Sequence, residues 1–597
     1  MRSTLFRKKT IRQIIGDVDI HGKTHASLNK NLRVIDLTGL GIAAVIGAGI
    51  FSTIGTAAAH GGPAVSLLFL FTAFACALSA MCYARFASII PISGSAYTYA
   101  YVAFGEFLAW IIGWDLIMEY AIGNIAVAIS WSDYFSGLMN GIGIHIPEYC
   151  RVDYLSASRG YHTALERMAE GVSFSQLTYP VQEAYHAWMN APRAGNIRLI
   201  ADIPAFSIVV FICTLVYIGI YETKVAANTM VFIKISILLI IITVGSFYID
   251  PANWSPFAPN GISGVLKGVS GVFFAYIGFD AISTTAEECR NPRRDLPRAI
   301  IYALIITTIL YVSISLVLTG MVHYSELSVG DPLAYAFSKL HLTKLSGIIG
   351  LSAVIAMAGV LLVFQVGQPR IWMSMSRDGL LPKSFGKIHR RFRTPWFATL
   401  VAGTFVAIPS LFMNLTEVTD LCSIGTLFAF VLVSAGVIAL DQQDKRKSSP
   451  HDNTPFTTPT TLTTPTTPTP FHIPYLNSRY FLPIFWIVII IILFWWNPPE
   501  LHEIFKNRVV NETRDQYGIS FHPDMIPLII FIIIAVITTI WAIMKQFSLI
   551  PVLGLLTNLY LMAQLGMTNW LRFLVWLMIG LIIYFTFSRK HSKLRGL

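Results

Sequence analysis

The sequence predicts an all-α membrane protein that crosses the bilayer many times, and three observations support this fold class. Of its 597 residues, 54% are hydrophobic and only 13% are charged, whereas about a quarter of the residues in an average soluble domain are charged. The mean hydropathy is +0.62. Long apolar runs recur along the chain, and many approach the ~20 residues that a helix needs to cross a bilayer.

Fourteen apolar segments are expected to be membrane-spanning helices. In chain order they are 34–59, 63–88, 106–138, 203–221, 227–249, 265–286, 299–321, 346–369, 396–414, 418–440, 480–496, 525–544, 548–567 and 570–588. They divide the chain into a basic tail (1–33), five spans (34–249), five further spans (265–440), four more (480–588) and a short tail (589–597). The first tail has neither the apolar core nor the cleavage site of a signal peptide.

The distribution of basic residues predicts the orientation. Fourteen crossings leave both termini on one side. If that side is cytoplasmic, its segments hold 30 Lys and Arg, against 12 outside. Five of the twelve lie in the long external loop 139–201, where charge hardly affects topology. The basic residues that give the chain its net charge of +11 are therefore expected to contact anionic lipid head groups and not nucleic acid.

Two segments are expected to lie outside the membrane. The loop 139–201 is long enough to contain short helices of its own. Residues 441–479 include the tract SSPHDNTPFTTPTTLTTPTTPTP. A Thr/Pro tract cannot bury a core, so we expect a disordered cytoplasmic linker there.

Two of the expected spans contain glycines that would interrupt a helix. The first span carries AAVIGAGIFSTIG, and the sixth carries GVFFAYIGFDAISTTAEE. Unwound backbone at membrane depth is tolerated only where it lines a protein cavity, although close packing of small residues explains either segment alone. If the first ten spans are two halves of five, the two segments occupy equivalent positions. Paired interruptions of this kind indicate the binding site of a transporter.

The interrupted spans would offer a ligand both donors and acceptors. Free N–H groups at the start of a half-helix attract an anion such as a carboxylate, and exposed carbonyl groups accept hydrogen bonds from an ammonium group. Together they fit the zwitterion of an α-amino acid. The predicted backbone site comprises Ile46, Gly47, Ala48, Gly49, Ile50, Phe274, Ala275 and Ile277.

The stretches that carry these glycines resemble the amino acid–polyamine–organocation superfamily, and within it the cationic amino acid transporter family and its bacterial relatives. The matching stretches are GLGIAAVIGAGIF, PISGSAYTYAYVAFGEFLAWIIGWDLIMEYAIG, NTMVFIKI, NWSPFAPNGISGVLKGVSGVFFAYIGFDAISTTAEECRNPRRDLPRAI, GQPRIWMSMSRDGLLP and NLYLMAQLGMTNWLRFLVWLMIGLIIYFTFSRKHSKL. The resemblance implies a LeuT-like fold of five plus five helices in an inverted repeat, with helices 1 and 6 broken, and it implies amino acid transport. The loop 139–201 looks longer than is usual in the family, and the spans 480–496 and 525–544 resemble the extra pair of fourteen-helix members.

Lys234 is a charged residue inside the apolar stretch NTMVFIKISILLIIITVG. A lysine at the centre of a membrane helix costs roughly 2.5–3.5 kcal/mol on insertion scales. The resemblance implies that it matches a lysine on helix 5 of proton-coupled relatives, whose ammonium takes the place of a sodium ion. We expect Lys234 to hold helix 5 against helices 1 and 8 when protonated and to release them when it loses the proton. The alternative is a lysine that snorkels or is permanently paired.

Three further side chains complete the predicted site, and each has more than one interpretation. Glu119 lies four residues from Asp115 on one helix face, and we expect it to take part in proton coupling, with Lys234 or a substrate side chain as its partner. Asp280 lines the substrate pocket, completes a charge network or caps a half-helix. The resemblance places Met357 where helix 8 limits the space for the substrate side chain; ordinary packing is the alternative.

These features predict a secondary active amino acid transporter in the plasma (inner) membrane, coupled to protons by symport and working by alternating access. The alternatives are an exchanger or uniporter for cationic amino acids, an amino acid sensor with a transporter fold, and a channel. The sequence lacks HExxH, GxSxG and metal-ligand spacing, so we expect no enzyme, cofactor or metal. The expected partners are amino acid, protons and lipids; a small accessory membrane subunit is left open.

Overall fold

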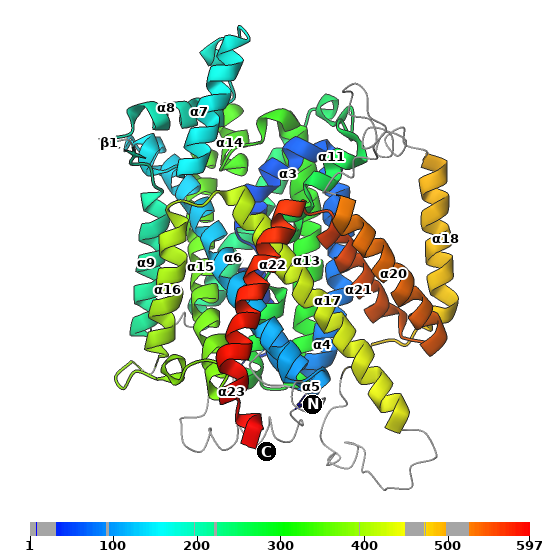
Figure 1. The fold of residues 1–597 in the computed structure, drawn as a ribbon. Coiled ribbons are helices and arrows are strands. Elements are labelled where there is room, and N and C mark those ends of the chain that lie inside the picture. Colours follow the sequence, from blue (N-terminus) through cyan, green and yellow to red (C-terminus); the bar gives the residue numbers. More distant parts are fainter. Residues whose placement is uncertain are drawn as a thin grey trace, which may run out of the picture.

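A computed structural model describes residues 7–8, 32–90, 95–195, 197–219, 224–392, 394–447, 471, 473–496 and 525–596. Long helices stand side by side in one bundle, with α7 and α8 at one end and α5 and α23 at the other (Figure 1). The predicted N-terminal tail and the Thr/Pro tract lie almost entirely outside the described residues.

The described helices occupy every expected span. The first five spans correspond to α2 (Val34–Val45) with η1 (Gly49–Thr53) and α3 (Ile54–Gly61), α4 (Val65–Ile89), α6 (Glu106–Gly141), α9 (Ile203–Ile218) and α10 (Lys224–Gly245). The next five correspond to α11 (Gly261–Lys267) with α12 (Val269–Phe274) and η7 (Phe279–Glu288), α13 (Pro292–Met321), α15 (Thr343–Arg377), α16 (Trp396–Ser410) and α17 (Leu415–Lys447). The last four correspond to α18 (Ser478–Trp496), α20 (Ile526–Lys545), α21 (Leu549–Ala563) and α22 (Met567–Ile583).

Nine helices of the described chain are long and apolar enough to cross a membrane, and five shorter apolar helices accompany them. The protein is therefore a polytopic helical membrane protein. The count of fourteen crossings and the five-plus-five repeat remain predictions, because length and composition alone do not show which helices cross.

Several helix boundaries differ from the expected ones. α9 ends three residues early because Gly219, at φ 83°, donates its N–H to the carbonyls of Leu215 and Val216 and so terminates the helix. α13 begins seven residues early, at Pro292, where a missing N–H is harmless in the first turn. Two helices between spans, α5 (Ser95–Ala103) and α14 (Pro332–Lys339), were not predicted from the sequence.

The loop 139–201 contains α7 (Tyr154–Ala169), α8 (Tyr179–Asn190) and a hairpin of β1 (Arg193–Ala194) and β2 (Ile197–Arg198). The predicted short helices are confirmed, but the hairpin means that the chain is not entirely helical. A salt bridge of 2.7 Å between Arg151 and Glu183 ties the loop together.

Asp202 joins this loop to α9. Its side chain is 2% exposed and accepts hydrogen bonds from Ser132 Oγ (2.6 Å) and from the N–H of Ala205 (3.0 Å), so it caps α9. Burial raises the pKa of the Asp202 carboxyl to about 7, although both hydrogen bonds act to lower it.

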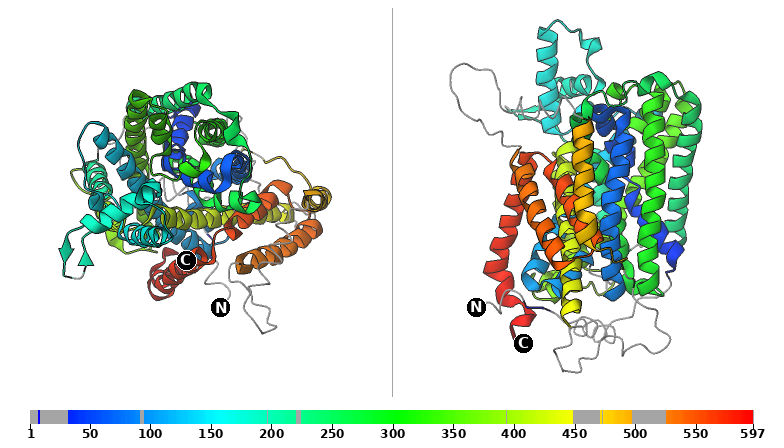
Figure 2. Two further views of the ribbon diagram at one scale, coloured as in Figure 1. Left: turned by 90° about the horizontal axis from the view of Figure 1, so that it is seen from above. Right: turned by 90° about the vertical axis from the view of Figure 1, so that its right-hand side faces the viewer.

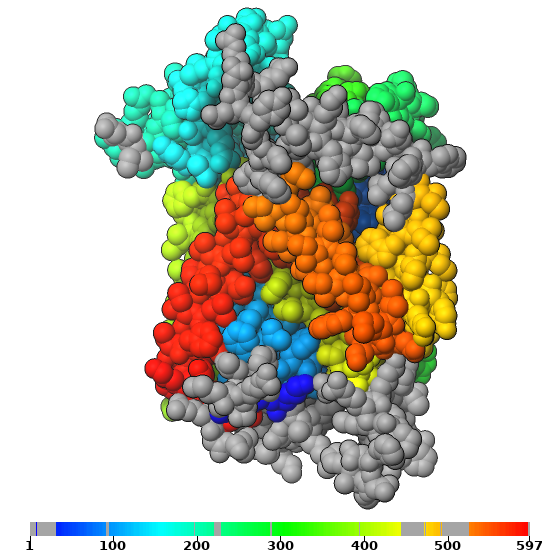
Figure 3. All heavy atoms as spheres, turned by 45° about the vertical axis from the view of Figure 1, so that its right-hand side comes forward, coloured from blue at the N-terminus to red at the C-terminus, as the bar shows by residue number. Residues whose placement is uncertain are grey.

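The burial of the helices shows where the core lies. The most apolar stretch of α6 is completely buried, whereas only 17% of the corresponding stretch of α20 is buried. An apolar helix that is buried all round belongs in the centre of a bundle, so α6 is central. α18 and α20 lie at one side of the bundle (Figures 2 and 3).

α22 packs directly on α6. The rings of Trp114 and Trp576 stack with centroids 4.6 Å apart, and each indole N–H donates to the backbone carbonyl of the other residue, at 2.9 and 3.3 Å. The last long helix is therefore an integral part of the bundle around α6.

Candidate functional site

The backbone is interrupted at both predicted places. α2 ends at Val45, and Ile46 leaves the helical conformation with φ −76° and ψ 96°. α12 ends at Phe274, and the chain passes through Gly278, at φ 112°, into the 3₁₀ helix η7. A positive φ is strained for residues with a Cβ atom, which explains glycine at 278.

The two interruptions touch each other. A Cβ atom on Gly49 would lie 2.2 Å from Ala275 Cα, and one on Gly278 would lie 3.1 Å from the carbonyl carbon and oxygen of Ala44. The backbones therefore meet without a side chain between them. The two segments are more than 200 positions apart in the chain, and the glycines in each had predicted an interruption. The structure brings these glycines into contact with the opposite segment.

Lys234 lies against the end of α2. The side chain is 2% exposed, and Nζ donates to the carbonyl oxygens of Ala43 (2.9 Å) and Ile46 (3.1 Å). The last carbonyls of a helix lack partners within it and carry partial negative charge that favours a cation. The charge in the apolar helix α10 thus has a physical explanation at the first interruption, and it does not point to lipid.

Hydroxyl groups that the sequence analysis did not select bind the same backbone. Tyr311 OH donates to Val45 O at 3.0 Å. Thr53 Oγ1 lies 2.8 Å from both Gly49 O and Gly271 O, so it bridges the two interrupted segments. The sequence gives one indication of the roles of Thr53 and Tyr311: each is a polar residue within an apolar span.

Some of the predicted acceptors are already engaged. Ile46 O accepts from Lys234, and Phe274 O accepts from the N–H of Ile277 at 3.2 Å. Ile46, Ile50 and Ala275 are each 0% exposed. The two interruptions are thus closed on each other, and a ligand would need them to move apart.

Three buried carboxyl groups lie beside the second interruption. Asp115 and Glu119 on α6 and Asp280 on η7 are 1%, 4% and 2% exposed. Glu119 faces the other two carboxyls and the hydroxyl of Thr426. Among the described residues, neither oxygen of Asp115 has a hydrogen-bond partner.

Asp280 has backbone N–H groups around it. Those of Gly278, Asp280 itself and Ala281 face its carboxyl. This arrangement is that of a residue capping the turn it begins, which was one of the alternatives for Asp280.

Met357 lies on the face of α15 that meets the first interruption. Its side chain is 0% exposed. Val360, three residues further along and therefore on the same helix face, would lie 2.9 Å from a Cβ atom on Gly47. The position of Met357 near the first interruption is compatible with a role at the substrate site. The full burial of Met357 is equally typical of a packing residue.

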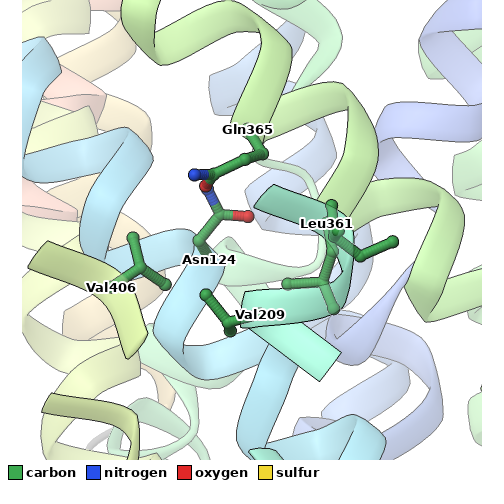
Figure 4. A pocket seen from close by; sticks show the side chains of 6 residues that line it. Asn124, Val209, Leu361, Gln365 and Val406 are labelled. Carbon is green, nitrogen blue, oxygen red and sulfur yellow. The ribbon is translucent and has the colours of Figure 1, made fainter. Parts of the chain in front are cut away.

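A narrow pocket lies elsewhere, between α6, α9, α15 and α16, and has no room for a water molecule (Figure 4). It is lined by Asn124, Val209, Ile212, Leu361, Gln365 and Val406. Asn124 Nδ2 donates to Gln365 Oε1 at 3.3 Å, while Asn124 Oδ1 and Gln365 Nε2 have no partner among the described residues. The sequence analysis missed this amide pair, which holds α6 to α15.

Comparison with known proteins identifies what the chain is similar to. The amino acid permease family matches residues 32–513, and the C-terminal region of that family matches residues 548–592. The branched-chain amino acid permease BcaP of Bacillus subtilis is 35% identical over 100% of both chains. The methylthioribose transporter of the same bacterium is 34% identical over 99% of both. The mitochondrial cationic amino acid transporter 3 of Arabidopsis thaliana is 29% identical over 99% of this chain and 95% of the relative.

Proposed function

The chain belongs to the amino acid permease family, within the amino acid–polyamine–organocation superfamily, and from this premise we propose that it is a proton-coupled amino acid symporter that works by alternating access. Amino acid transport follows from the family. The coupling to protons is the finer proposal, and the observation that supports it is the position of Lys234 at the end of α2.

The proposed coupling uses the charge on one amine. A protonated Lys234 has three N–H donors and a positive charge, which suit the carbonyls of Ala43 and Ile46 and the negative end of the α2 dipole. Loss of the proton removes the charge, so the two N–H donors that remain make weaker hydrogen bonds to these carbonyls. The attachment of α10 to α2 then weakens, and the first interruption is free to separate from the second. Glu119 is buried beside the carboxyls of Asp115 and Asp280, and we propose that it belongs to the same proton path.

The proposed substrate is a neutral amino acid of small or medium size. The backbone groups around Gly47–Ile50 and Phe274–Ile277 would bind the carboxylate and ammonium groups of any amino acid, and Asp280 and Met357 would limit the side chain. A full-length relative is named as a branched-chain amino acid permease, which agrees with this size. Cationic amino acids are the runner-up, because other relatives are named for them.

Uptake in proteoliposomes tests the proposal. The purified protein, reconstituted with an interior more alkaline than the exterior, should accumulate labelled leucine, isoleucine or valine, and a protonophore should abolish the accumulation. Uptake of labelled arginine or lysine that responds to membrane potential but not to the pH gradient would instead indicate a cationic amino acid uniporter or exchanger.

Two controls separate the remaining functions. Counterflow of labelled substrate into liposomes loaded with the unlabelled compound occurs only if the protein moves its ligand, so binding without counterflow would indicate a sensor. If unlabelled methylthioribose inhibits uptake and unlabelled amino acids do not, the substrate is instead the compound for which the second full-length relative is named.

In the plasma membrane, we propose that both termini face the cytoplasm, because the segments on that side hold the larger share of Lys and Arg.

A further inference from the structure

The last residues of the described chain fold back onto the end of the bundle. α22 is followed by the π-helical turn η12 (Tyr584–Ser588) and the short helix α23 (Arg589–His591). We call residues 588–594, which include α23, the C-terminal segment. Ser588 Oγ donates to Leu380 O at 2.6 Å, and the N–H of Lys593 donates to Asp378 O at 3.2 Å. The segment is thus attached to the residues that follow α15.

Glu106, the first residue of α6, is the centre of a second set of contacts. Its side chain is 2% exposed. Its carboxylate accepts hydrogen bonds from Ser592 Oγ (2.6 Å), Tyr584 OH (3.3 Å) and Tyr101 OH (3.4 Å). Two of these donors belong to the end of the chain, and the third belongs to α5. A buried carboxylate whose donors were removed would be strongly destabilised.

The other end of the chain reaches the same place. Arg7 Nη1 donates to Leu594 O at 2.9 Å, the N–H of Glu106 donates to Arg7 O at 2.9 Å, and Lys8 Nζ donates to Ala103 O at 2.6 Å. Residues from both chain ends therefore enclose the link between α5 and α6.

α5 also contacts the second interruption. Tyr97 OH donates to Asp378 Oδ2 at 2.6 Å, and Ser283 Oγ of η7 donates to Ser95 Oγ of α5 at 3.2 Å. Both serines are 0% exposed. α5 thus lies between the C-terminal segment on one side and the second half of the interrupted helix on the other.

We propose that the C-terminal segment is a latch that holds α5 against η7 and keeps this end of the transport path closed. Opening toward this end requires α5 to move away from η7. The contacts of Ser592 with Glu106 and of Ser588 with Leu380 oppose that movement, because Glu106 and Asp378 bind Tyr101 and Tyr97 of α5. The chain thereby limits its own rate of opening through residues outside the substrate site. The inference concerns only the closure of this end and does not depend on which substrate is carried.

A native thiol reports the opening. Cys289 follows η7 directly, is 1% exposed and pairs with Leu32 in a β-bridge. In protein whose other five cysteines are replaced by serine or alanine, the rate of alkylation of Cys289 by N-ethylmaleimide measures how often this end opens. We expect Ser592→Ala to raise that rate about tenfold, which corresponds to about 1.4 kcal/mol and is close to the lower end of the range for a hydrogen bond to a charged group.

The matched control is Thr586→Ala in the same terminal region, because within the part of the chain that the structure describes Thr586 Oγ1 bonds only the carbonyls of Ile582 and Ile583, in the turn that precedes it. A second single-cysteine protein retains Cys76, which is 0% exposed in α4, and reports general loosening. Faster alkylation of Cys289 alone in Ser592→Ala supports the latch. Unchanged alkylation, an equal rise in Thr586→Ala, or a parallel rise at Cys76 each overturns it. The labelling needs neither substrate nor gradient, so its outcome is separate from that of the uptake assay.

Discussion

Replacing Lys234 by methionine should remove the attachment between α10 and α2 while keeping the length of the side chain. The native ammonium donates to Ala43 O at 2.9 Å and to Ile46 O at 3.1 Å. A hydrogen bond to a charged group contributes about 1.5–3 kcal/mol, so the two together stabilise the closed arrangement by about 3–6 kcal/mol. The carbonyls of Ala43 and Ile46 would be left buried without their donor, which adds to the loss.

The assay is accumulation of labelled amino acid in proteoliposomes with an alkaline interior. A loss of 3 kcal/mol changes an equilibrium by about 100-fold, so we expect pH-driven accumulation by Lys234→Met to fall to the level of liposomes without protein. Lys267→Met is the matched control, because Lys267 is exposed at the end of α11, and it should accumulate normally. Normal pH-driven accumulation by Lys234→Met would refute the role of this amine in coupling.

Three other changes have defined outcomes. Gly49→Ala should destabilise the closed state by about 1–3 kcal/mol and slow uptake, because the new Cβ would lie 2.2 Å from Ala275 Cα. The control is Gly141→Ala, whose Cβ would have no atom within 4 Å. It should change neither stability nor uptake when both variants are compared by thermal unfolding and uptake assays. Because burial raises the pKa of Asp202 from 3.8 to about 7, the carboxyl binds its proton more tightly in the folded state than in the unfolded state. The free energy of unfolding should therefore fall as pH rises from about 4 to about 7, and Asp202→Asn should flatten that slope in pH-resolved thermal unfolding. Met357→Ser should admit larger side chains in a competition assay with the twenty amino acids, and an unchanged substrate profile would show that Met357 only packs.

The positions of the helices were predictable because they depend on local composition. The apolar runs predicted a helix in every expected span, and the glycines around 47–49 and at 278 predicted the two interruptions, since a backbone without Cβ atoms is needed where segments meet or turn. Lys234 was recognisable from its neighbours alone, because a charge in an apolar run has few explanations.

The contacts of the site were less predictable because they join residues far apart in the chain. No periodicity indicates that Ile46 O would be taken by Lys234, that Tyr311 would bind Val45 O, or that Asn124 would pair with Gln365. Each pair depends on the packing of separate helices. The helix α5 was missed for another reason, since its nine residues are too few and too polar to resemble a membrane span.

The paired tryptophans at positions 114 and 576 have a consequence for how the protein is made. The two residues are 462 positions apart, so α6 enters the membrane long before its partner has been synthesised. Until then its indole N–H group at position 114 must find a temporary acceptor in lipid, water or a helper protein.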